Sequence, residues 1–346
     1  MMHSALPKSL ERFYADEDNT AIAAYESALK NYFGATYCLA LSSGTASLLA
    51  ALVAVGSTRG DQVVAPPTAP LCTAYPILST GSTLAFGDIR PGNFGLDVDG
   101  LFRIAGNNTR AIVEVPMWGY ATPAEALRDF AADRAIPLIF DLAHCAGTTL
   151  HGRPLSDYCD IACFSTQKHK IFSTGEGGFL LTNNEAYYQR ALMYTRMGEL
   201  NGKDFGLNFK ISSVQAQAGI AALETISQNL RTRRSNSTRI TSAITNPAVA
   251  EVEVIAGSEP SYQRLLLQSK KAGRALAAHL VSRGIPSDMH KYGIKPLYDY
   301  PILQQLKTPC PNAEHMLSAT TTVPVHHAYC EQDLAYIIDS INSFRQ

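Results

Sequence analysis

The sequence lacks an excess of charge of either sign and lacks a long uninterrupted hydrophobic run. Its 29 Lys and Arg residues nearly balance its 30 Asp and Glu residues, which gives a net charge of −1. Without a basic field to hold a phosphate backbone, nucleic acid is not expected as a partner. No apolar stretch reaches the length that spans a bilayer, and Met1 to Asp16 lacks the basic-then-apolar order of a secretory signal. No membrane partner is expected.

The sequence also lacks a CxxC pair, an internal repeat and a low-complexity segment, and its cysteine count of seven is odd. These features favour reduced thiols in a cytoplasmic protein. Cys159 and Cys163, with His144 and His169 nearby, raise the question of a metal site. Their spacing matches no usual ligand pair, and the segment around them is typical of a buried strand. The sequence therefore predicts no metal.

Strand-like and helix-like segments alternate along the first two thirds of the 346 residues. Apolar runs predict strands at 37–41, 61–65, 83–86, 111–116, 136–140, 160–164 and 178–182. Amphipathic patterns predict helices at 18–33, 45–55, 73–78, 123–134, 185–197 and 213–229. This order predicts an α/β fold with a large, mostly parallel sheet of seven strands that helices cover on both faces.

A second domain is expected beyond the last of these helices. The basic and polar stretch 231–239 is the expected boundary, because its texture differs from the segments before it. Short strands at 250–255 and 262–268 and helices at 272–283 and 331–342 predict a smaller α+β unit. The sequence thus predicts a large α/β domain at 1–230 and a small C-terminal α+β domain at 231–346.

Polar residues gather at the carboxyl ends of the predicted strands, where parallel sheets bind ligands. They are Ser42 to Thr45, Asp141 with His144, Ser165 with Lys168 and Lys170, and the turn Gly175 to Gly178. Each alone is more often a helix cap or a solvated side chain, but four in one domain favour a site. A lysine amine condenses with an aldehyde, a carboxylate holds a pyridine nitrogen protonated, and helix N-terminal amides bind phosphate. Together these groups indicate a pyridoxal 5′-phosphate (PLP) site.

Four segments carry a resemblance to a known family: LSSGTASL, FDLAHCAGTTLHGR, CFSTQKHKIFSTGEGGFLLTN and GLNFKISSVQAQAG. From about Tyr14 to its C-terminus the chain resembles the DegT/DnrJ/EryC1/StrS family, PLP-dependent sugar aminotransferases of the aspartate aminotransferase-like fold-type I. In the family a Gly-Glu-Gly-Gly turn starts five residues after the reactive lysine. Since that turn starts here at Gly175, the spacing selects Lys170 over Lys168.

The resemblance implies a role for each matching residue in catalysis. Lys170 would be the Schiff-base lysine and the proton shuttle, and Asp141 would pair with the pyridinium nitrogen. His144 stands where the family contacts the phenolic oxygen of the cofactor ring.

The resemblance also implies a phosphate site and a shared active site. Gly44, Thr45 and Ser165 would hold the cofactor phosphate. Asn208 matches an asparagine that reaches the cofactor phosphate of the partner subunit, so a homodimer with a shared active site is expected.

Four positions depart from the family pattern. Pro70 replaces an aromatic residue that stacks on the cofactor, and Pro116 replaces a histidine. Lys210 replaces an arginine, and Tyr298 replaces the histidine of a Pro-Leu-His motif. These changes leave the cofactor chemistry in place and leave open whether the acceptor is a nucleotide sugar.

The function that the resemblance implies is amino transfer from an amino acid, with glutamate expected, to a keto-sugar or related ketone in a biosynthetic pathway. One alternative keeps the cofactor and performs elimination, dehydration or carbon–carbon bond formation on an amino acid or sugar. A second alternative is a non-catalytic sensor or partner subunit. The presence of Lys170 favours amino transfer, since a binding protein has no need of a Schiff-base lysine.

Three other features have a functional and a structural interpretation. Trp118 lines a pocket or packs in the core, and Arg196 binds a substrate carboxylate or caps a helix. His326 and His327 approach the pocket or form a structural pair. The structural interpretation is favoured for the histidine pair and for Trp118.

Overall fold

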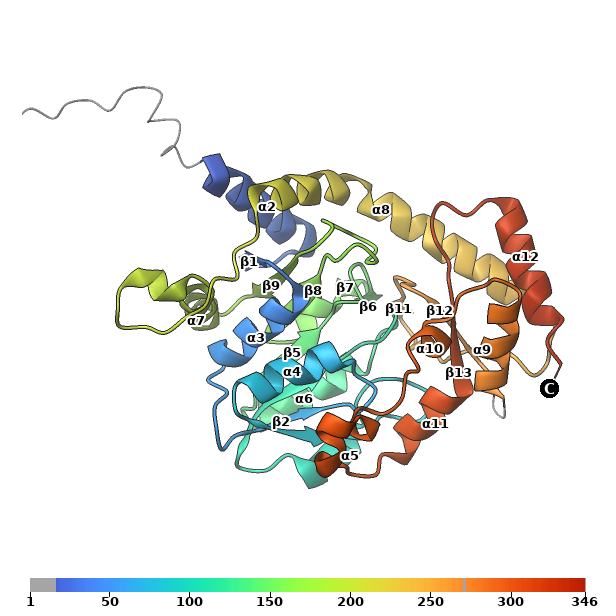
Figure 1. The fold of residues 1–346 in the computed structure, drawn as a ribbon, viewed down its shortest axis with the longest axis horizontal. Helices are drawn as coiled ribbons and strands as arrows, with labels where there is room; N and C mark the ends of the chain where they lie inside the picture. The colour runs from blue at the N-terminus through green and yellow to red at the C-terminus, as the bar shows by residue number, and fades with distance from the viewer. Residues whose placement is uncertain (1–16, 270–271, 346) are drawn as a thin grey trace, which may run out of the picture.

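The computed structural model describes residues 17–269 and 272–345. The first sixteen residues, for which the sequence predicts no secretory signal, lie outside this part. Figure 1 shows a unit built on a central sheet, a second unit formed by the C-terminal segments, and the long helix α8 (Ser213–Ser242) that extends from one to the other.

The central sheet has seven strands in the order β1-β9-β8-β5-β4-β2-β3. The strands are β1 (Tyr37–Leu41), β2 (Gln62–Ala65), β3 (Thr83–Phe86), β4 (Thr109–Glu114), β5 (Leu138–Asp141), β8 (Ile161–Ser165) and β9 (Gly178–Thr182). β9 runs antiparallel to both of its neighbours, and the other neighbouring pairs are parallel. The predicted seven-stranded, mostly parallel sheet is confirmed, with strand ends that differ by a few residues.

Helices cover both faces of this sheet because successive strand residues point to opposite sides. Leu39 and Leu41 of β1 belong to one hydrophobic core, whereas Cys38 and Ala40 belong to the other. The first core includes α3 (Gly44–Ala54), α4 (Leu71–Ser79) and α7 (Glu185–Thr195). The second includes α2 (Glu17–Phe33), α5 (Val98–Ile104), α6 (Ala124–Asp133) and the first half of α8.

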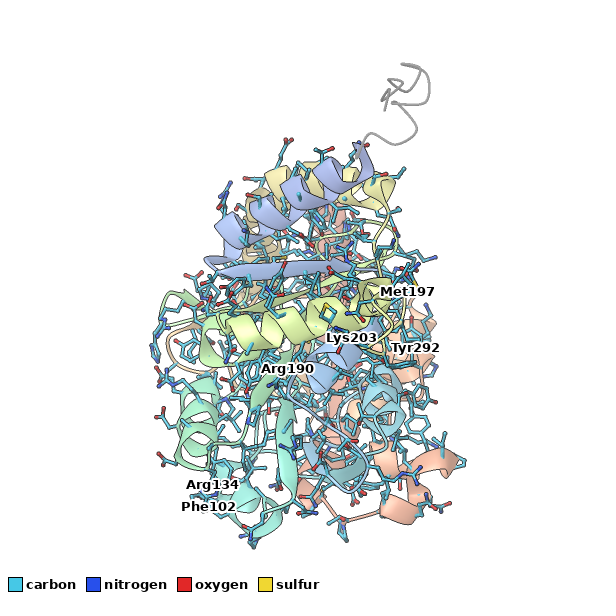
Figure 2. All side chains as sticks on the ribbon, turned by 90° about the vertical axis from the view of Figure 1, so that its left-hand side faces the viewer. Phe102, Arg134, Arg190, Met197, Lys203 and Tyr292 are labelled. Atoms are coloured by element: carbon cyan, nitrogen blue, oxygen red, sulfur yellow. The ribbon has the colours of Figure 1, made fainter. Side chains whose placement is uncertain are left out.

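Two arginine side chains that Figure 2 labels, Arg190 and Arg134, connect neighbouring helices. Arg190 of α7 donates a 3.1 Å hydrogen bond to the carbonyl of Ala54, where α3 ends. Arg134 lies over the rings of Phe102 and Phe130, at 4.4 and 4.3 Å from their centroids, and so joins the end of α6 to α5. Such cation–π contacts stabilise helix packing without a carboxylate partner.

The C-terminal unit has a small antiparallel sheet of β10 (Ala250–Glu251), β12 (Leu265–Gln268) and β13 (Thr320–Val323). Its helices are α9 (Gly273–Ser282), α10 (Asp288–Lys291), α11 (Pro311–Ala319) and α12 (Glu331–Asn342). A third sheet joins β6 (Thr149–Leu150) and β7 (Arg153–Pro154) to β11 (Ser258–Glu259). Short 3-10 helices lie at Leu155–Tyr158, Met197–Leu200, Leu297–Asp299 and Pro301–Leu306.

One predicted element ends in the wrong place. The helix expected to end at Asn229 continues to Ser242 and is 30 residues long, and the basic stretch 231–239 lies inside it. Buried side chains continue at helical spacing through Ile226, Leu230 and Ile240, and the charged residues of the stretch other than the buried Arg233 occupy the remaining faces. The position between residues 230 and 231 is therefore within a helix, and the division of the chain into two domains there stays a prediction.

In residues 17–269 and 272–345, no helix is both long enough and apolar enough to cross a membrane. The seven cysteines all lie in this part and are free thiols. Cys163 is buried in β8, as expected for a cysteine that acts as a small apolar residue.

A carboxyl group lies fully buried at the end of β4. The side chain of Glu114 is inaccessible to solvent, and its Oε2 accepts a 3.1 Å hydrogen bond from the backbone N–H of Leu96. Burial raises the pKa of Glu114 to about 8, although the hydrogen bond from Leu96 opposes the shift. The folded protein therefore favours the protonated form of this side chain at neutral pH.

The Glu114→Gln variant should lose part of the pH dependence of unfolding. Because the folded-state pKa lies above the unfolded-state value, the stability linked to Glu114 is fully present at low pH and is lost as the pH rises to about 8. This loss is on the order of 3 kcal/mol between about pH 5 and pH 8. Chemical denaturation should show the variant to be more stable than the wild type only at the higher pH.

The exposed Glu224 provides a matched control, since Glu224→Gln makes the same chemical change on the surface of α8. Its unfolding should follow the wild-type pH dependence. Parallel curves for wild type and Glu114→Gln would show that the buried carboxyl does not titrate as described.

Candidate active site

The predicted site residues meet at one edge of the central sheet. Gly178, the first residue of β9, pairs with Leu41 at the end of β1 and with Ser165 at the end of β8. This double pairing follows from the antiparallel direction of β9, which begins where its two neighbours end. A Cβ at Gly178 would approach the backbone of Ser43 to 2.5 Å, so the close approach of the segments requires glycine.

A second close approach joins Gly44 to Ser165. A Cβ at Gly44 would lie 2.7 Å from the Cβ of Ser165, so the first turn of α3 and the end of β8 are in contact. Ser43 caps α3 by accepting a 3.0 Å hydrogen bond from the N–H of Ala46. The N–H groups of Gly44 and Thr45 open the helix and have no intrahelical acceptor. With the Ser165 hydroxyl they form the polar cradle that suits a phosphate.

Asp141 ends β5 and is only 9% exposed. Its Oδ2 accepts a 2.8 Å hydrogen bond from the Thr73 hydroxyl, and its Oδ1 accepts a 3.2 Å bond from the N–H of Ala143. Burial raises the pKa of Asp141, while these hydrogen bonds and the charge of Lys170 act in the opposite direction. Both carboxylate oxygens are thus held in a fixed orientation.

Lys170 is half-buried, whereas Lys168 is exposed. Burial lowers the pKa of Lys170, and the negative charge of Asp141 opposes this shift. A lysine with a lowered pKa presents more of its neutral, nucleophilic amine near neutral pH. Of the two lysines, the structure places Lys170 in the environment that a reactive amine requires.

The imidazole of His144 has a defined donor and acceptor side. Its Nδ1 accepts a 3.3 Å hydrogen bond from the backbone N–H of Trp118, and the two rings stack with centroids 6.3 Å apart. Burial lowers the pKa of His144 well below its usual value, and the charges of Lys170 and Arg264 add to this shift. The neutral ring therefore carries its proton on Nε2, which is free to donate to a ligand.

A cavity of about 250 Å³ opens beside these residues and is lined from both units of the chain. Its lining includes Thr68, Pro70, Trp118, His144, Asp288, Tyr292 and Lys295. The hydroxyl oxygen of Thr68 is buried and has no hydrogen-bond partner in the described part of the chain. An unsatisfied buried oxygen on a cavity wall fits a polar ligand in that cavity.

Asn208 lies apart from the other predicted residues. Its side chain is exposed, and its Oδ1 accepts a 3.3 Å hydrogen bond from the N–H of Lys210. The neighbouring Phe209 accepts a 2.9 Å hydrogen bond from the N–H of Ser42 through its carbonyl. This hydrogen bond attaches residues 208–210 to the end of β1. In this position the Asn208 side chain faces solvent.

The remaining sequence candidates have clear positions. Trp118 is buried and also lines the cavity, so both interpretations hold for it. Arg196 is the C-cap residue of α7, and its charge acts on the half-buried Glu26. Tyr298 is buried and donates a 2.8 Å hydrogen bond to Glu314 inside the C-terminal unit. Of the departures from the family pattern, Pro70 lines the cavity.

Sequence reasoning missed several residues of the site. Thr73 holds Asp141 from a position 68 residues earlier in the chain. Asp288 and Lys295 reach the cavity from the C-terminal unit. No local spacing pattern links these residues to the strand ends, because the contacts depend on how the two units pack.

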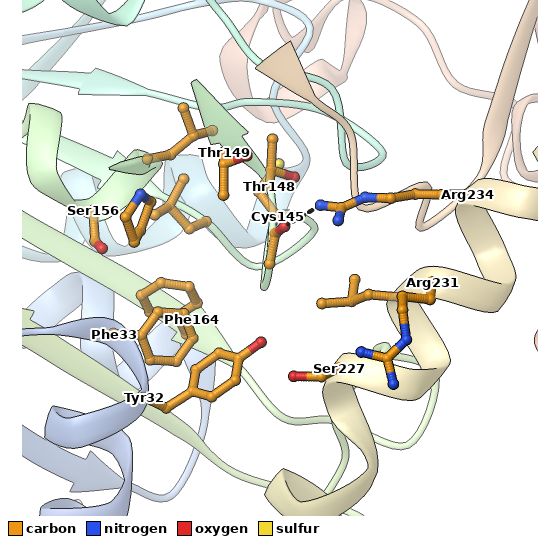
Figure 3. Close-up of a pocket in the computed structure, with 15 residues that line it drawn as sticks. Tyr32, Phe33, Cys145, Thr148, Thr149, Ser156, Phe164, Ser227, Arg231 and Arg234 are labelled. Atoms are coloured by element: carbon orange, nitrogen blue, oxygen red, sulfur yellow. Dashed lines mark hydrogen bonds between the residues drawn. The ribbon is translucent and has the colours of Figure 1, made fainter. Parts of the chain in front are cut away.

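A separate pocket of about 370 Å³ opens between α2, α8 and the segment that follows β5 (Figure 3). Arg234 reaches across it to donate a 2.9 Å hydrogen bond to the carbonyl of Gly147, and Tyr32 and Ser227 lie on the facing side. The seven predicted site residues, all within the described ranges, do not line it. This pocket is therefore distinct from the cavity of about 250 Å³ that His144 and Trp118 line.

Comparisons with known proteins identify relatives of this chain. GDP-perosamine synthase from Caulobacter vibrioides is 28% identical over 241 residues, which cover 66% of this chain and 65% of that protein. L-glutamine:scyllo-inosose aminotransferase from Streptomyces griseus is 34% identical over 167 residues, which cover 48% of this chain and 39% of that protein. The chain thus spans less than two thirds of the length of these two relatives.

The crystal structure of AtS13 from Actinomadura melliaura matches with a TM-score of 0.88 and 25% identity, over 97% of this chain and 94% of that chain. The family model for the DegT/DnrJ/EryC1/StrS aminotransferase family matches residues 13–342. The resemblance noted in the four sequence segments thus extends over nearly the whole length. The chain belongs to the DegT/DnrJ/EryC1/StrS aminotransferase family.

Proposed function

We propose that this protein is a PLP-dependent aminotransferase that moves an amino group from an amino acid to a keto-sugar or a related cyclic ketone. The observation that carries the proposal is that a half-buried amine, Lys170, lies within electrostatic range of the buried and hydrogen-bonded carboxylate of Asp141. Membership of an aminotransferase family supports this choice over elimination chemistry and over a non-catalytic role.

The residues at the sheet edge fit PLP. Asp141 would hold the pyridine nitrogen, and the Nε2–H of His144 would donate to the phenolic oxygen. Gly44, Thr45 and Ser165 would hold the phosphate, in the cradle where a Cβ at Gly44 would be only 2.7 Å from Ser165. When bound, PLP supplies an aldehyde for an amine and a ring that accepts electrons released from carbon.

The protein contributes proton transfer and orientation. With PLP bound, the Nζ of Lys170 would accept a proton from the α-carbon of the donor and deliver it to the cofactor carbon that carried the aldehyde, because its lowered pKa keeps a neutral fraction. The ionised form of Asp141 keeps the ring nitrogen protonated, and Thr73 fixes the carboxylate at the required angle. His144, being neutral, donates a hydrogen bond without adding positive charge.

The lining of the cavity suits an acceptor that is polar and about the size of a sugar ring. Asp288, Tyr292 and Lys295 bring polar groups opposite the apolar wall of Pro70 and Trp118, which suits a hydroxylated ketone. The name of the Streptomyces griseus relative, with glutamine as donor and a cyclic ketone as acceptor, supports the same reaction class. We expect glutamate or glutamine as donor, and the free thiols favour a cytoplasmic location.

A homodimer with a shared active site forms part of the proposal. Large apolar side chains are exposed around Asn208, at Leu200, Phe205 and Leu207. Exposed apolar groups of this size in one segment favour a protein contact. A second copy of the chain on this segment would bring Asn208 toward the partner's cofactor, whereas in its own subunit the side chain faces solvent.

The Lys170→Ala variant should lose amino transfer and the visible absorbance of bound PLP, because Lys170 provides the amine that condenses with the aldehyde. The matched Lys168→Ala variant changes an exposed lysine two residues away and should retain both. After borohydride reduction, mass spectrometry should find the pyridoxyl group on Lys170 in the wild type. Turnover and unchanged absorbance in Lys170→Ala would contradict the assignment.

The Thr73→Val variant should lower kcat roughly ten- to a hundredfold, since a hydrogen bond to a charged group contributes about 1.5–3 kcal/mol. The loss should appear in kcat more than in the KM of the amino donor, because Thr73 orients the carboxylate of Asp141 that would hold the ring nitrogen. Thr238→Val, on an exposed face of α8, is the control and should behave as wild type. An unchanged kcat in Thr73→Val would remove Thr73 from the site.

Mixing two impaired variants tests the shared site. Lys170→Ala lacks the amine and Asn208→Ala lacks the proposed partner contact, but a mixed dimer regains one site with both residues intact. Activity should therefore rise above the sum of the separate variants after subunit exchange. Light scattering should give the mass of two chains. A monomer, or a mixture with merely additive activity, would contradict the shared site.

A further inference from the structure

The pocket of about 370 Å³ between α2, α8 and the segment after β5 has no role in the proposed reaction, and we call it the α2–α8 pocket (Figure 3). Its volume lies in the range of about 300–1,000 Å³ that is usual for small-molecule sites. Within the described ranges, no residue lines both this pocket and the cavity of about 250 Å³ that His144 and Trp118 line. A ligand in the α2–α8 pocket would therefore leave the proposed active site open.

One part of the lining is aromatic and apolar. The rings of Phe33 and Phe164 lie with their centroids 4.8 Å apart and their planes at 43° (Figure 3). Leu155 and Leu230 extend this apolar surface, and all four side chains are buried. A ligand ring that covers such a surface removes further apolar area from water. This part of the lining therefore suits the flat face of an aromatic ring.

Two hydroxyl groups of the lining point toward each other, at Tyr32 of α2 and Ser227 of α8 (Figure 3). Burial raises the pKa of Tyr32, and a hydrogen bond with Ser227 opposes this shift. The phenol is therefore uncharged at neutral pH. A hydrogen bond between two hydroxyls uses one of their two protons, so the second proton can be donated to an acceptor on a ligand.

A third hydroxyl of the lining has no partner. The Oγ of Ser156 is buried, and no group in residues 17–269 and 272–345 forms a hydrogen bond with it. The hydroxyl of Thr148, by contrast, donates a 2.9 Å hydrogen bond to the carbonyl of Gly119 and lies 3.0 Å from the Ser261 hydroxyl. Buried hydroxyls are normally hydrogen-bonded, so Ser156 fits a polar group that enters the pocket.

The two arginines of the lining differ in their partners. Arg234 donates a 2.9 Å hydrogen bond to the carbonyl of Gly147 and pairs with Glu259 at 2.9 Å. Arg231 donates instead to the uncharged Oε1 of Gln228, and within the described ranges it forms no ion pair. No Asp or Glu of the described part lines the pocket. The charge of Arg231 therefore favours an anionic group on the ligand.

We propose that the α2–α8 pocket binds a small aromatic carboxylate, with the ring against Phe33 and Phe164 and the carboxylate at Arg231. A planar guanidinium binds a carboxylate through two parallel hydrogen bonds, which the single amide oxygen of Gln228 cannot reproduce. The hydroxyls of the lining would donate to polar substituents of the ring. The inference goes beyond the proposed amino transfer and uses none of the residues assigned to the cofactor.

Two simpler ligand classes suit the lining less well. An inorganic anion would satisfy Arg231 but would leave the apolar surface of Phe33 and Phe164 uncovered. An uncharged aromatic molecule would cover that surface but would leave Arg231 without a counter-ion. A carboxylate attached to an aromatic ring meets both requirements, so its uncharged counterpart is the comparison ligand for the test.

The test measures ligand binding without turnover. The full chain, supplied with PLP, is titrated calorimetrically with 2-naphthoate and separately with its uncharged counterpart 2-naphthamide. The carboxylate should bind, and the amide should bind roughly tenfold more weakly because it lacks the charge-assisted pair. Arg231→Gln should weaken 2-naphthoate by a similar factor and leave 2-naphthamide unchanged. Arg103→Gln, which removes an exposed arginine of α5, should bind both as the wild type does.

A second pair of variants tests the position of the ring. Ser227→Trp adds an indole to the lining from an exposed position of α8 and should abolish binding of both ligands. Ser235→Trp makes the same change at an exposed position of α8 outside the pocket and should bind both as the wild type does. Circular dichroism should show that both variants are folded.

The proposal is overturned if 2-naphthoate does not bind the wild type or if 2-naphthamide binds equally tightly. It is also overturned if either Arg231→Gln or folded Ser227→Trp binds 2-naphthoate as tightly as the wild type. Binding with the expected dependence on Arg231, in a protein without amino transfer to any tested ketone, would retain the pocket and reject the transaminase.

Discussion

Desolvation of two opposite charges at a single sheet edge governs this structure. Burial raises the pKa of Asp141 and lowers that of Lys170, so each group alone would tend to lose its charge. Their mutual attraction and the hydrogen bonds from Thr73 and Ala143 limit these shifts. An amine with a lowered pKa and an oriented carboxylate are the conditions that the proposed PLP chemistry requires.

The direction of β9 makes this arrangement possible. An antiparallel strand between β1 and β8 begins at the edge where its neighbours end, so Gly178 joins the helix N-terminus after β1 to Ser165. Gly44 and Gly178 permit this close approach, because a Cβ at either position would lie less than 3 Å from neighbouring atoms. Backbone packing thus brings together Gly44 and Ser165, two of the residues proposed to hold the cofactor phosphate.

The C-terminal unit supplies charge that the sheet does not. Asp288 and Lys295 of the C-terminal unit line the same cavity as His144. In the proposed reaction, the sheet edge would support the cofactor chemistry, and both units would contribute to substrate recognition. A change at Asp288 or Lys295 would then alter which ketone or donor is accepted while the Asp141 and Lys170 geometry stays the same.

Local patterns in the sequence were sufficient for the sheet and for its helical layers, since strand ends and glycine turns are features of neighbouring residues. The choice of Lys170 came from the family resemblance and stays a prediction. The continuation of α8 past Asn229 was hidden because charged side chains obscured its buried stripe. The contact of Thr73 with Asp141 and the solvent-facing position of Asn208 were decided only by the tertiary structure. They depend on burial and on distances between segments far apart in the chain, and no local spacing encodes these quantities.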